Sequence, residues 1–159
     1  METRNIFLDI GSSTVKVYKL SDNGALDFLE AQTMTFKEGF DPENGISLDS
    51  KSKLFNFVKN IKDKNPGVKV KTFATAIFRK LSKNAKKELI DEFFEATGLF
   101  FNIISQDLEN FYLETALTSK SNTSESVLLI NIGGGSTELV VLKDKKVLER
   151  KNIDLGVGT

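Results

Sequence analysis

Residues Val127 to Leu142, with the sequence VLLINIGGGSTELVVL, decide how the fold of the chain is interpreted. Two apolar runs flank three glycines and two hydroxyl residues, namely Gly133, Gly134, Gly135, Ser136 and Thr137. This pattern predicts a strand, a tight turn and a second strand. Because glycine tolerates positive φ and lets the backbone approach a ligand closely, neighbouring N–H groups can point at one anion. The stretch therefore predicts either a phosphate-binding hairpin or a hairpin whose glycines only make a turn.

A second copy of the pattern near the N-terminus favours the phosphate-binding interpretation. Residues Ile6 to Leu20 read IFLDIGSSTVKVYKL and align without a gap on Leu128 to Leu142. The alignment pairs Asp9 with Asn131, Gly11 with Gly133, Ser13 with Gly135 and Thr14 with Ser136. The repeated unit is too long for a solenoid, so it indicates a duplicated domain. We expect two similar domains whose glycine turns face each other across a cleft.

Composition restricts the chemistry that is available. The 159 residues carry 22 basic and 22 acidic side chains, and 40% are hydrophobic. No apolar run approaches the roughly 18 residues of a membrane span, so we expect a globular protein with no membrane segment. The balanced charge gives no support for nucleic-acid binding.

Two residue types are absent from the sequence, which contains no histidine and no cysteine. Their absence excludes a Ser-His-Asp triad, a thiol nucleophile and a metal site built on imidazole or thiolate. Carboxylates, hydroxyls, Lys, Arg, backbone amides and Mg²⁺ remain, and this set suits phosphate chemistry. The lack of cysteine is also compatible with a cytoplasmic location.

Hydrophobic periodicity predicts strands that alternate with helices. Strands are expected at residues 4–10, 14–20, 25–36, 68–74 and 99–104, in the hairpin of residues 127–142, and at 147–153. Three helices are expected, capped by Asp49 or Ser50, by Asn84 and by Ser105, with a partly helical connector at 75–81. Asn65 should end the first helix and Gly98 the second. Their inward faces should carry Leu54, Phe55, Val58 and Ile61 in the first helix, Leu89, Ile90, Phe93 and Phe94 in the second, and Leu108, Phe111, Tyr112 and Thr115 in the third.

This order of elements predicts an α/β fold in which flanking helices cover a mixed five-stranded sheet. The polar stretch at residues 120–126 is the expected linker. The first domain should therefore span residues 1–122. Residues 123–159 should form the opening strands of a second, truncated domain of the same kind.

Three blocks resemble the exopolyphosphatase and guanosine pentaphosphate phosphatase family, and together they cover nearly the whole chain. The first is Asp9-Ile10-Gly11-Ser12-Ser13, and the second is Ala74-Thr75-Ala76 followed by Arg79 and Asn84. The third runs from Ile104 and Ser105 through Glu109 and continues at Asn131-Ile132-Gly133-Gly134-Gly135-Ser136-Thr137-Glu138. The family is part of a superfamily with sugar kinases, acetate kinases, heat-shock chaperone ATPases and actin. The resemblance implies an actin-like ATPase fold of the ribonuclease H-like type.

The resemblance also implies an activity, namely Mg²⁺-dependent hydrolytic removal of a terminal phosphoryl group from polyphosphate or a guanosine polyphosphate. Glu109 lies at the position of the family's catalytic glutamate, which activates the attacking water, and Arg79 at that of an arginine near the phosphate path. Expected phosphate-binding residues are Gly11, Ser12, Ser13, Thr14, Gly133, Gly134, Gly135 and Ser136. Expected residues on the Mg²⁺ side are Asp9, Asn131 and Glu138. In the full-length protein we expect a cytoplasmic homodimer.

The residues by themselves leave blander interpretations open. Glu109 suits the first turn of a helix for dipole reasons alone. The alternative for Asp9 is a turn-capping residue, for Glu138 an exposed strand residue, and for Arg79 a solvated member of a basic stretch.

Two positions depart from the family pattern. Asn131 replaces the usual aspartate, which removes a negative charge beside the expected metal, and the acidic block reads Gln106-Asp107-Leu108-Glu109 where a glycine normally comes first. A non-catalytic phosphate- or nucleotide-binding regulator is therefore an alternative, and a kinase of the same superfamily is another. We expect the 159-residue chain by itself to be inactive or nearly so.

Overall fold

The computed structural model describes residues 5–22, 24–118, 126–133, 136–144 and 146–157. Contacts between residues divide the chain into two compact units, Met1–Ile103 and Ile104–Thr159. In the described part of the chain, none of the helices combines the length and hydrophobicity needed to cross a bilayer.

The first unit is built on a mixed five-stranded sheet, as predicted. Its strands are β1 (Asn5–Ile10), β2 (Thr14–Leu20), β3 (Leu26–Thr33), β4 (Lys69–Ala74) and β5 (Phe101–Ile103). They lie in the order β3-β2-β1-β4-β5. The β1–β2 and β2–β3 pairs are antiparallel, whereas the β1–β4 and β4–β5 pairs are parallel. The parallel pairs require crossovers, and the two long helices of this unit supply them.

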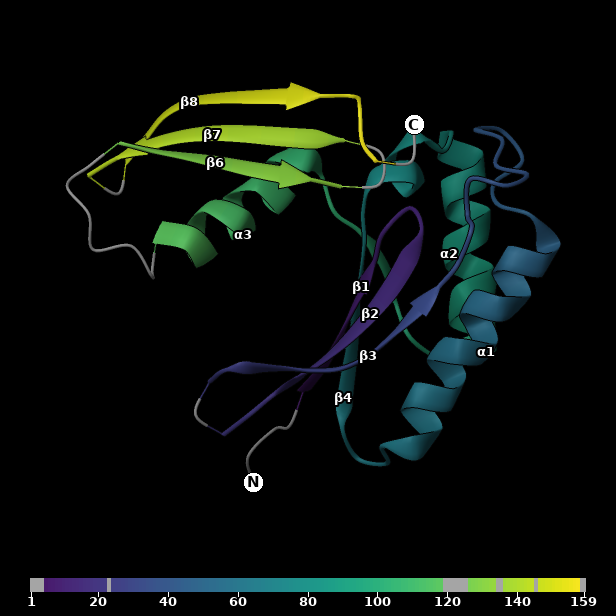
Figure 1. Ribbon diagram of the computed structural model, residues 1–159. Coiled ribbons are helices and arrows are strands. Elements are labelled where there is room, and N and C mark those ends of the chain that lie inside the picture. The colour runs from purple at the N-terminus through teal and green to yellow at the C-terminus, as the bar shows by residue number, and fades with distance from the viewer. Residues whose placement is uncertain (1–4, 23, 119–125, 134–135, 145, 158–159) are drawn as a thin grey trace. The chain divides into compact units, whose positions relative to one another are not determined.

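The helices α1 (Leu48–Lys64) and α2 (Lys83–Thr97) lie side by side along one side of this sheet (Figure 1). A short 3₁₀ helix, η1 (Ala76–Lys80), follows β4. The core between the layers contains a chain of phenylalanine rings, because Phe36 contacts Phe78, Phe78 contacts Phe101, and Phe101 contacts Phe93 at centroid distances of 4.9–5.2 Å. Such tilted and edge-to-face contacts add to the stabilisation that comes from burial.

The helix caps differ from those that the sequence predicts. Ser47, rather than Asp49 or Ser50, caps α1, since its side chain accepts a hydrogen bond from the Ser50 N–H. Ser82, rather than Asn84, caps α2 through the Ala85 N–H. Both helices begin before the first residue of their apolar pattern, so the pattern did not locate their first turns. The ends at Asn65 and at Gly98, which has φ of 67°, are confirmed.

Strand limits and one inward residue also differ. The strand expected at residues 25–36 ends at Thr33, and its last apolar residues, Met34 and Phe36, leave the sheet and enter the core. The strand expected at 99–104 is only three residues long. Phe94, expected to face inward from α2, is exposed and contacts the exposed Phe100 instead.

The second unit places one helix on a three-stranded antiparallel sheet. Its elements are α3 (Gln106–Thr118), β6 (Val127–Ile132), β7 (Thr137–Lys143) and β8 (Lys146–Ile153), and the strand order is β6-β7-β8. By contacts, α3 therefore groups with the later strands, whereas the sequence-based ranges 1–122 and 123–159 placed it with the first domain. The expected linker lies mostly outside the described residues. The assignment of those two ranges to actin-like domains stays a prediction.

The inward face of α3 is not the one predicted. Leu108, Phe111 and Tyr112 are exposed, Phe111 by 56%, and Thr115 is exposed as well. Among helix residues 106–115, whose side chains the structure describes, the buried ones are instead Asn110 and Glu114. Apolar spacing misled the prediction because the sheet presents polar side chains to the helix.

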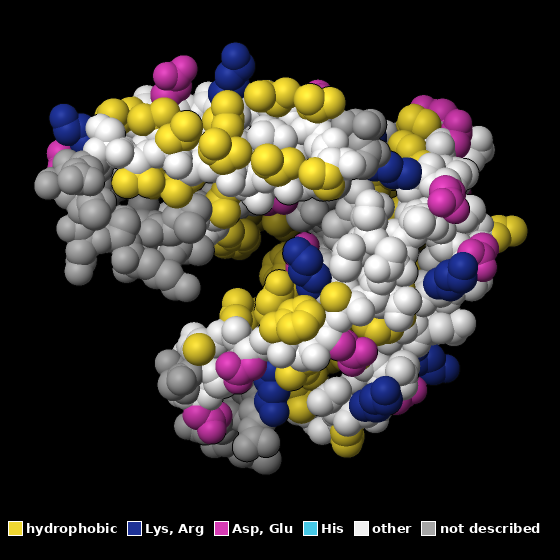
Figure 2. All heavy atoms as spheres, viewed as in Figure 1, with side chains coloured by type: hydrophobic (Ala, Val, Ile, Leu, Met, Phe, Trp, Pro, Cys, Tyr) yellow, Lys and Arg dark blue, Asp and Glu magenta, His cyan; other side chains and the backbone are white. Residues whose placement is uncertain are grey.

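The opposite surface of the second sheet is apolar. Figure 2 shows hydrophobic side chains gathered over β6–β8, and Leu128, Ile130 and Ile132 of β6 are each more than half exposed. Along β6 these residues alternate with less exposed ones, as expected for a strand whose two faces have different surroundings.

Candidate functional site

The first glycine turn connects β1 to β2 and is fixed by three backbone hydrogen bonds. The Gly11 N–H donates to the Thr14 carbonyl at 3.0 Å, and the Met34 N–H donates to the Ser13 carbonyl at 2.9 Å. The Thr75 N–H donates to the Ile10 carbonyl at 3.1 Å. The turn is therefore held by the segments that follow β3 and β4. Ser12, one of the expected phosphate-binding residues, is buried in it.

The second glycine turn, between β6 and β7, repeats this geometry. The Gly133 N–H donates to the Ser136 carbonyl at 2.8 Å, which is the bond expected from the alignment of Gly133 with Gly11 and Ser136 with Thr14. The strand pairs also correspond, because Asp9 lies opposite Lys16 and Asn131 lies opposite Glu138. The two turns thus share their closing hydrogen bond and the pairing of their flanking strands. Gly134 and Gly135 lie outside the described residues.

At Gly11 and Gly133, positive φ is not the reason for glycine. Neither Gly11 nor Gly133 has positive φ. A Cβ atom on Gly133 would lie only 3.3 Å from the Ser136 carbonyl oxygen, whereas one on Gly11 would make an ordinary contact at 3.5 Å. At residue 133, close approach of the backbone therefore favours glycine.

Asp9 is a carboxylate in a poorly solvated position. Burial raises the pKa of Asp9 above its ordinary value, and the charge of Lys16 on the paired strand opposes this rise. Because water solvates this carboxylate poorly, a nearby cation would stabilise its charged form. Asp9 therefore fits the role of a Mg²⁺-side carboxylate.

Arg79 lies in η1, which begins where the first turn is anchored. Thr75 precedes η1, and its N–H is the group that bonds Ile10 at the end of β1. Ala76 has φ of 48°, a left-handed conformation that costs a residue with a Cβ about 1–2 kcal/mol. The central block of the sequence thus holds a strained residue beside a glycine turn. Strain of this kind is common at functional sites.

Glu109 lies in the first turn of α3, as predicted. Ser105 caps this helix, since its hydroxyl accepts a hydrogen bond from the Leu108 N–H at 3.2 Å, and the Glu109 N–H donates to the Ser105 carbonyl at 3.0 Å. The side chain of Glu109 is half-buried. A carboxylate in the first helical turn is favoured by the helix dipole, whatever its chemical role.

Glu138 is buried, with only 2% of its surface exposed, so the interpretation as an exposed strand residue is wrong. Its Oε1 atom accepts hydrogen bonds from Ser136 Oγ at 2.7 Å and from Gln106 Nε2 at 3.0 Å. Its Oε2 atom accepts one from Asn131 Nδ2 at 2.8 Å. Three neutral donors thus satisfy the carboxylate.

This arrangement does not fit Asn131 and Glu138 as metal ligands. Mg²⁺ takes oxygen ligands, and here the Asn131 amide turns its nitrogen toward the carboxylate while both Glu138 oxygens already accept hydrogen bonds. Within the described ranges, no three Asp, Glu, His or Cys side chains gather as a metal-binding group. Ser136 also commits its hydroxyl proton to Glu138, so we expect it to contact a phosphate through its backbone N–H.

The expected site residues are distributed over both units. Asp9, Gly11, Ser12, Ser13, Thr14 and Arg79 belong to the first unit, and Glu109, Asn131, Gly133, Ser136 and Glu138 belong to the second. The cleft expected between the two glycine turns stays a prediction.

Polar residues of α3 that the sequence analysis did not recognise bind the helix to the sheet. Gln106, Asn110 and Glu114 each bond the sheet, to Glu138, to Asn152 and to Arg150 respectively. A polar stripe at positions i, i+4 and i+8 was the signal that could have identified them.

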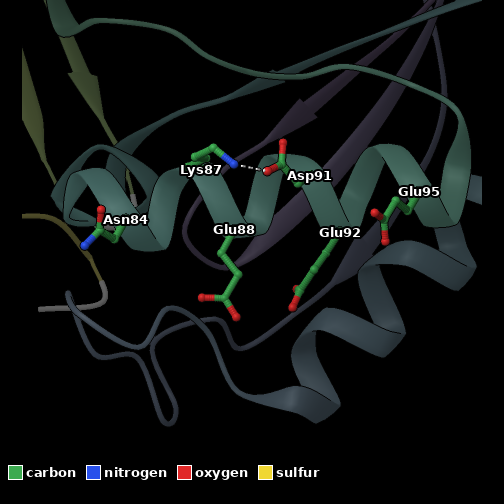
Figure 3. Close-up of a pocket in the computed structure, with 6 residues that line it drawn as sticks. All are labelled: Asn84, Lys87, Glu88, Asp91, Glu92 and Glu95. Carbon is green, nitrogen blue, oxygen red and sulfur yellow. Dashed lines mark hydrogen bonds and ion pairs between the residues drawn. The ribbon is translucent and has the colours of Figure 1, made fainter.

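A hollow of about 320 Å³ lies elsewhere, on α2, and contains none of the expected site residues. It is lined by Asn84, Lys87, Glu88, Asp91, Glu92 and Glu95 (Figure 3). Lys87 pairs with Asp91 at 2.6 Å, and Glu92 lies 2.7 Å from Lys51 of α1. All lining residues come from one helix, and the exposed Lys87–Asp91 pair is typical of a solvated helix face.

Comparisons with known proteins agree with the fold. A family model described as the Ppx/GppA phosphatase family matches residues 21–159, a range that begins after the first glycine turn. No curated protein matches the chain. A solved Ppx/GppA family member from Aquifex aeolicus is 24% identical over 97% of this chain and 52% of its own, with a TM-score of 0.72.

Two further solved structures have the same fold. An exopolyphosphatase from Cytophaga hutchinsonii is 20% identical over 96% of this chain and 51% of its own, with a TM-score of 0.75. A Bacteroides thetaiotaomicron protein with an actin-like ATPase fold is 8% identical over 97% of this chain and 71% of its own, with a TM-score of 0.60. The predicted actin-like fold is confirmed, and the chain spans about half the length of the Aquifex and Cytophaga proteins.

Proposed function

Because the chain belongs to the Ppx/GppA phosphatase family, we propose that the full-length protein hydrolyses the terminal phosphoanhydride bond of inorganic polyphosphate or guanosine pentaphosphate. One observation supports this most directly. Gln106, in the first turn of α3, donates a hydrogen bond to Glu138 beside the glycine turn, so the helix that carries Glu109 is joined to the expected phosphate-binding segment. The candidate base and the second of the two expected phosphate-binding turns therefore belong to one compact unit.

In the proposed reaction, Glu109 accepts a proton from a water molecule whose oxygen attacks the terminal phosphorus. The bond from this phosphorus to the bridging oxygen breaks, and that oxygen leaves with the bonding electrons on the shortened chain. Positioning and charge neutralisation account for most of the catalysis of phosphoryl transfer. Backbone N–H groups of the glycine turns and the guanidinium of Arg79 would orient and neutralise the phosphate oxygens.

Mg²⁺ is part of the proposal, with Asp9 as its holder in this chain. When bound, the ion would neutralise charge on the phosphate oxygens. Asp9 suits this role because its carboxylate is poorly solvated, and Mg²⁺ commonly keeps several waters and uses only one or two protein carboxylates.

The experiment compares phosphate release from polyphosphate, guanosine pentaphosphate and ATP at saturating Mg²⁺, with the full-length protein and its Glu109→Gln variant. We expect release from one of the first two substrates and a loss of roughly 10²–10⁴-fold in kcat in the variant, which is the usual contribution of a general base. Glu95→Gln, the same change on an exposed residue of α2, is the matched control and should leave the rate unchanged.

The other outcomes would each contradict a part of the proposal. Release that is unaffected by Glu109→Gln would show that Glu109 is not the base. Transfer of the terminal phosphoryl group of ATP to an acceptor, in place of its release as phosphate, would favour a kinase. Binding of these compounds without release would favour a non-catalytic phosphate-binding regulator, an alternative that Asn131 supports because its amide occupies the place of the usual aspartate.

A further inference from the structure

The two positions at which the chain departs from the family pattern contact the same side chain. Gln106 replaces a glycine and Asn131 replaces an aspartate, and the amide nitrogens of both donate to the Glu138 carboxylate, at 3.0 and 2.8 Å. These positions are far apart in the sequence, and each introduces a neutral donor. The two departures are therefore complementary to one buried anion.

Neutral donors are what a buried carboxylate without a cation requires. An ionised carboxylate in a poorly solvated site is stable only when its oxygens accept hydrogen bonds or meet a positive charge. Asn131, Gln106 and Ser136 provide three donors, one on each of three segments that meet at Glu138. An aspartate at residue 131 would provide a donor only by taking up a proton, and a glycine at residue 106 would leave α3 without this bond.

The same contact begins a row of polar contacts that fixes α3 on the sheet. Asn110 Nδ2 donates to Asn152 Oδ1 at 3.2 Å, one helical turn after Gln106, and Glu114 pairs with Arg150 one turn later. Glu138 lies opposite Asn152, and Val140 lies opposite Arg150, so the contacts follow the strand register. A helix held by successive side-chain bonds has one defined position along the sheet, whereas apolar packing alone would allow it to shift.

We propose that Gln106 is a positioning residue, which through Glu138 holds the first turn of α3, and with it Glu109, in a fixed place beside the β6–β7 turn. This inference rests on the proposed function, because it assigns Gln106 a task in the same reaction. Glu109 follows Gln106 by three residues, so the two side chains belong to one helical turn. A shift of the helix would move Glu109 relative to the turn, while the groups that bind phosphate would be preserved.

The test uses Gln106→Glu, Glu138→Gln and the double variant in which the two side chains are exchanged. Gln106→Glu has the same shape as the wild type but replaces the donor by a second carboxylate. We expect its melting temperature at pH 7 to fall by about 7–15 °C, because one of the two neighbouring carboxyls must take up a proton. The exchanged pair restores one donor and one acceptor, so it should melt higher than Gln106→Glu. Gln32→Glu, on the exposed strand β3, is the matched control and should melt like the wild type.

Kinetics of the full-length protein distinguish a positioning role from a purely structural one, because a purely structural role would leave kcat of the folded variant unchanged. With folded Gln106→Glu, we expect kcat to fall roughly 10–100-fold while KM changes less than about twofold, because misplacement of a reacting group affects the reaction more than binding. In the exchanged pair kcat should partly recover. Additive melting temperatures in the double variant would overturn the contact, and an unchanged kcat in Gln106→Glu would overturn the positioning role.

The inference and the proposed function fail in different ways. If the wild-type protein releases no phosphate from any substrate, the proposed function is wrong, and with it the positioning role. The melting temperatures of the four proteins would still decide whether Gln106 and Glu138 are coupled. Repeating them in excess Mg²⁺ and in EDTA gives a further check, because a contact that needs no metal should show the same coupling in both.

Discussion

Asn131→Asp restores the residue that the family pattern has at this position, and we expect it to destabilise this chain. The new carboxylate would lie where Asn131 Nδ2 now donates to Glu138 at 2.8 Å. At an effective dielectric constant near 20, two unit charges at this distance repel by ~6 kcal/mol. Protonation of one carboxyl at pH 7 costs only ~4 kcal/mol, given an ordinary pKa of about 3.9. The pair should therefore take up a proton, which limits the destabilisation to about 4 kcal/mol.

The pH dependence follows from the direction of that pKa shift. The folded protein raises the pKa of one carboxyl above its unfolded value, so stability is retained below about pH 4 and lost as the pH rises through the folded pKa. The cost of protonation falls to ~1.5 kcal/mol at pH 5. The loss in melting temperature relative to the wild type should therefore shrink from about 8–16 °C at pH 7 to about 3–6 °C at pH 5.

Thermal unfolding of the wild type, Asn131→Asp and Asn56→Asp, measured at both pH values with and without Mg²⁺, checks this reasoning. Asn56 is exposed on α1, so its substitution makes the same charge change without a buried partner. Mg²⁺ should raise the melting temperature of Asn131→Asp, because a second carboxylate beside Glu138 creates a cation site. The wild type has an amide at residue 131, so Mg²⁺ should not stabilise it at this position. An Asn131→Asp protein as stable as the wild type at pH 7 in EDTA would refute the argument.

Two further predictions concern the first unit. Because burial raises the pKa of Asp9, the charged carboxylate costs stability at neutral pH. Asp9→Asn should therefore raise the melting temperature near pH 7, and this gain should disappear below about pH 4. An equal gain at all pH values would contradict the prediction. Ala76→Gly should stabilise the chain by about 0.5 kcal/mol, since relief of the left-handed φ outweighs the extra entropy of glycine in the unfolded state. Denaturant unfolding measures the change, and Ala74→Gly, at a position of ordinary strand geometry, is the control that should destabilise. A destabilised Ala76→Gly protein would contradict the prediction.

The sequence predicted those parts of the fold that depend on local and repeated patterns. The alignment of Gly11 with Gly133 predicted two turns of the same kind, and each is closed by the equivalent backbone bond, because similar sequences with similar flanking strands form the same local hydrogen bonds. The order of strands and helices was also predictable, since buried strands and amphipathic helices have different periodicities.

The inward face of α3 could not be predicted in the same way. Leu108, Phe111 and Tyr112 satisfy the helical spacing of a buried stripe, yet the buried residues are Asn110 and Glu114. Periodicity identifies the apolar side of a helix but carries no information about the surface against which the helix packs. Here that surface is polar, because Glu138, Asn152 and Arg150 point toward α3 and bond its side chains. Such complementarity becomes visible only when both elements are placed.

The same limitation changes how departures from a family pattern are judged. Considered singly, Asn131 is a lost charge beside an expected metal, and Gln106 is a lost glycine at a helix start. In the structure both Asn131 and Gln106 donate a hydrogen bond to the Glu138 carboxylate. Replacing one of them by the family residue removes its hydrogen bond, and the other residue does not replace it. The loss of a metal-side charge at residue 131 therefore does not by itself exclude catalysis. If Asp9 supplies the carboxylate on the metal side and Glu109 accepts the proton, neither departure removes a group that the proposed reaction needs.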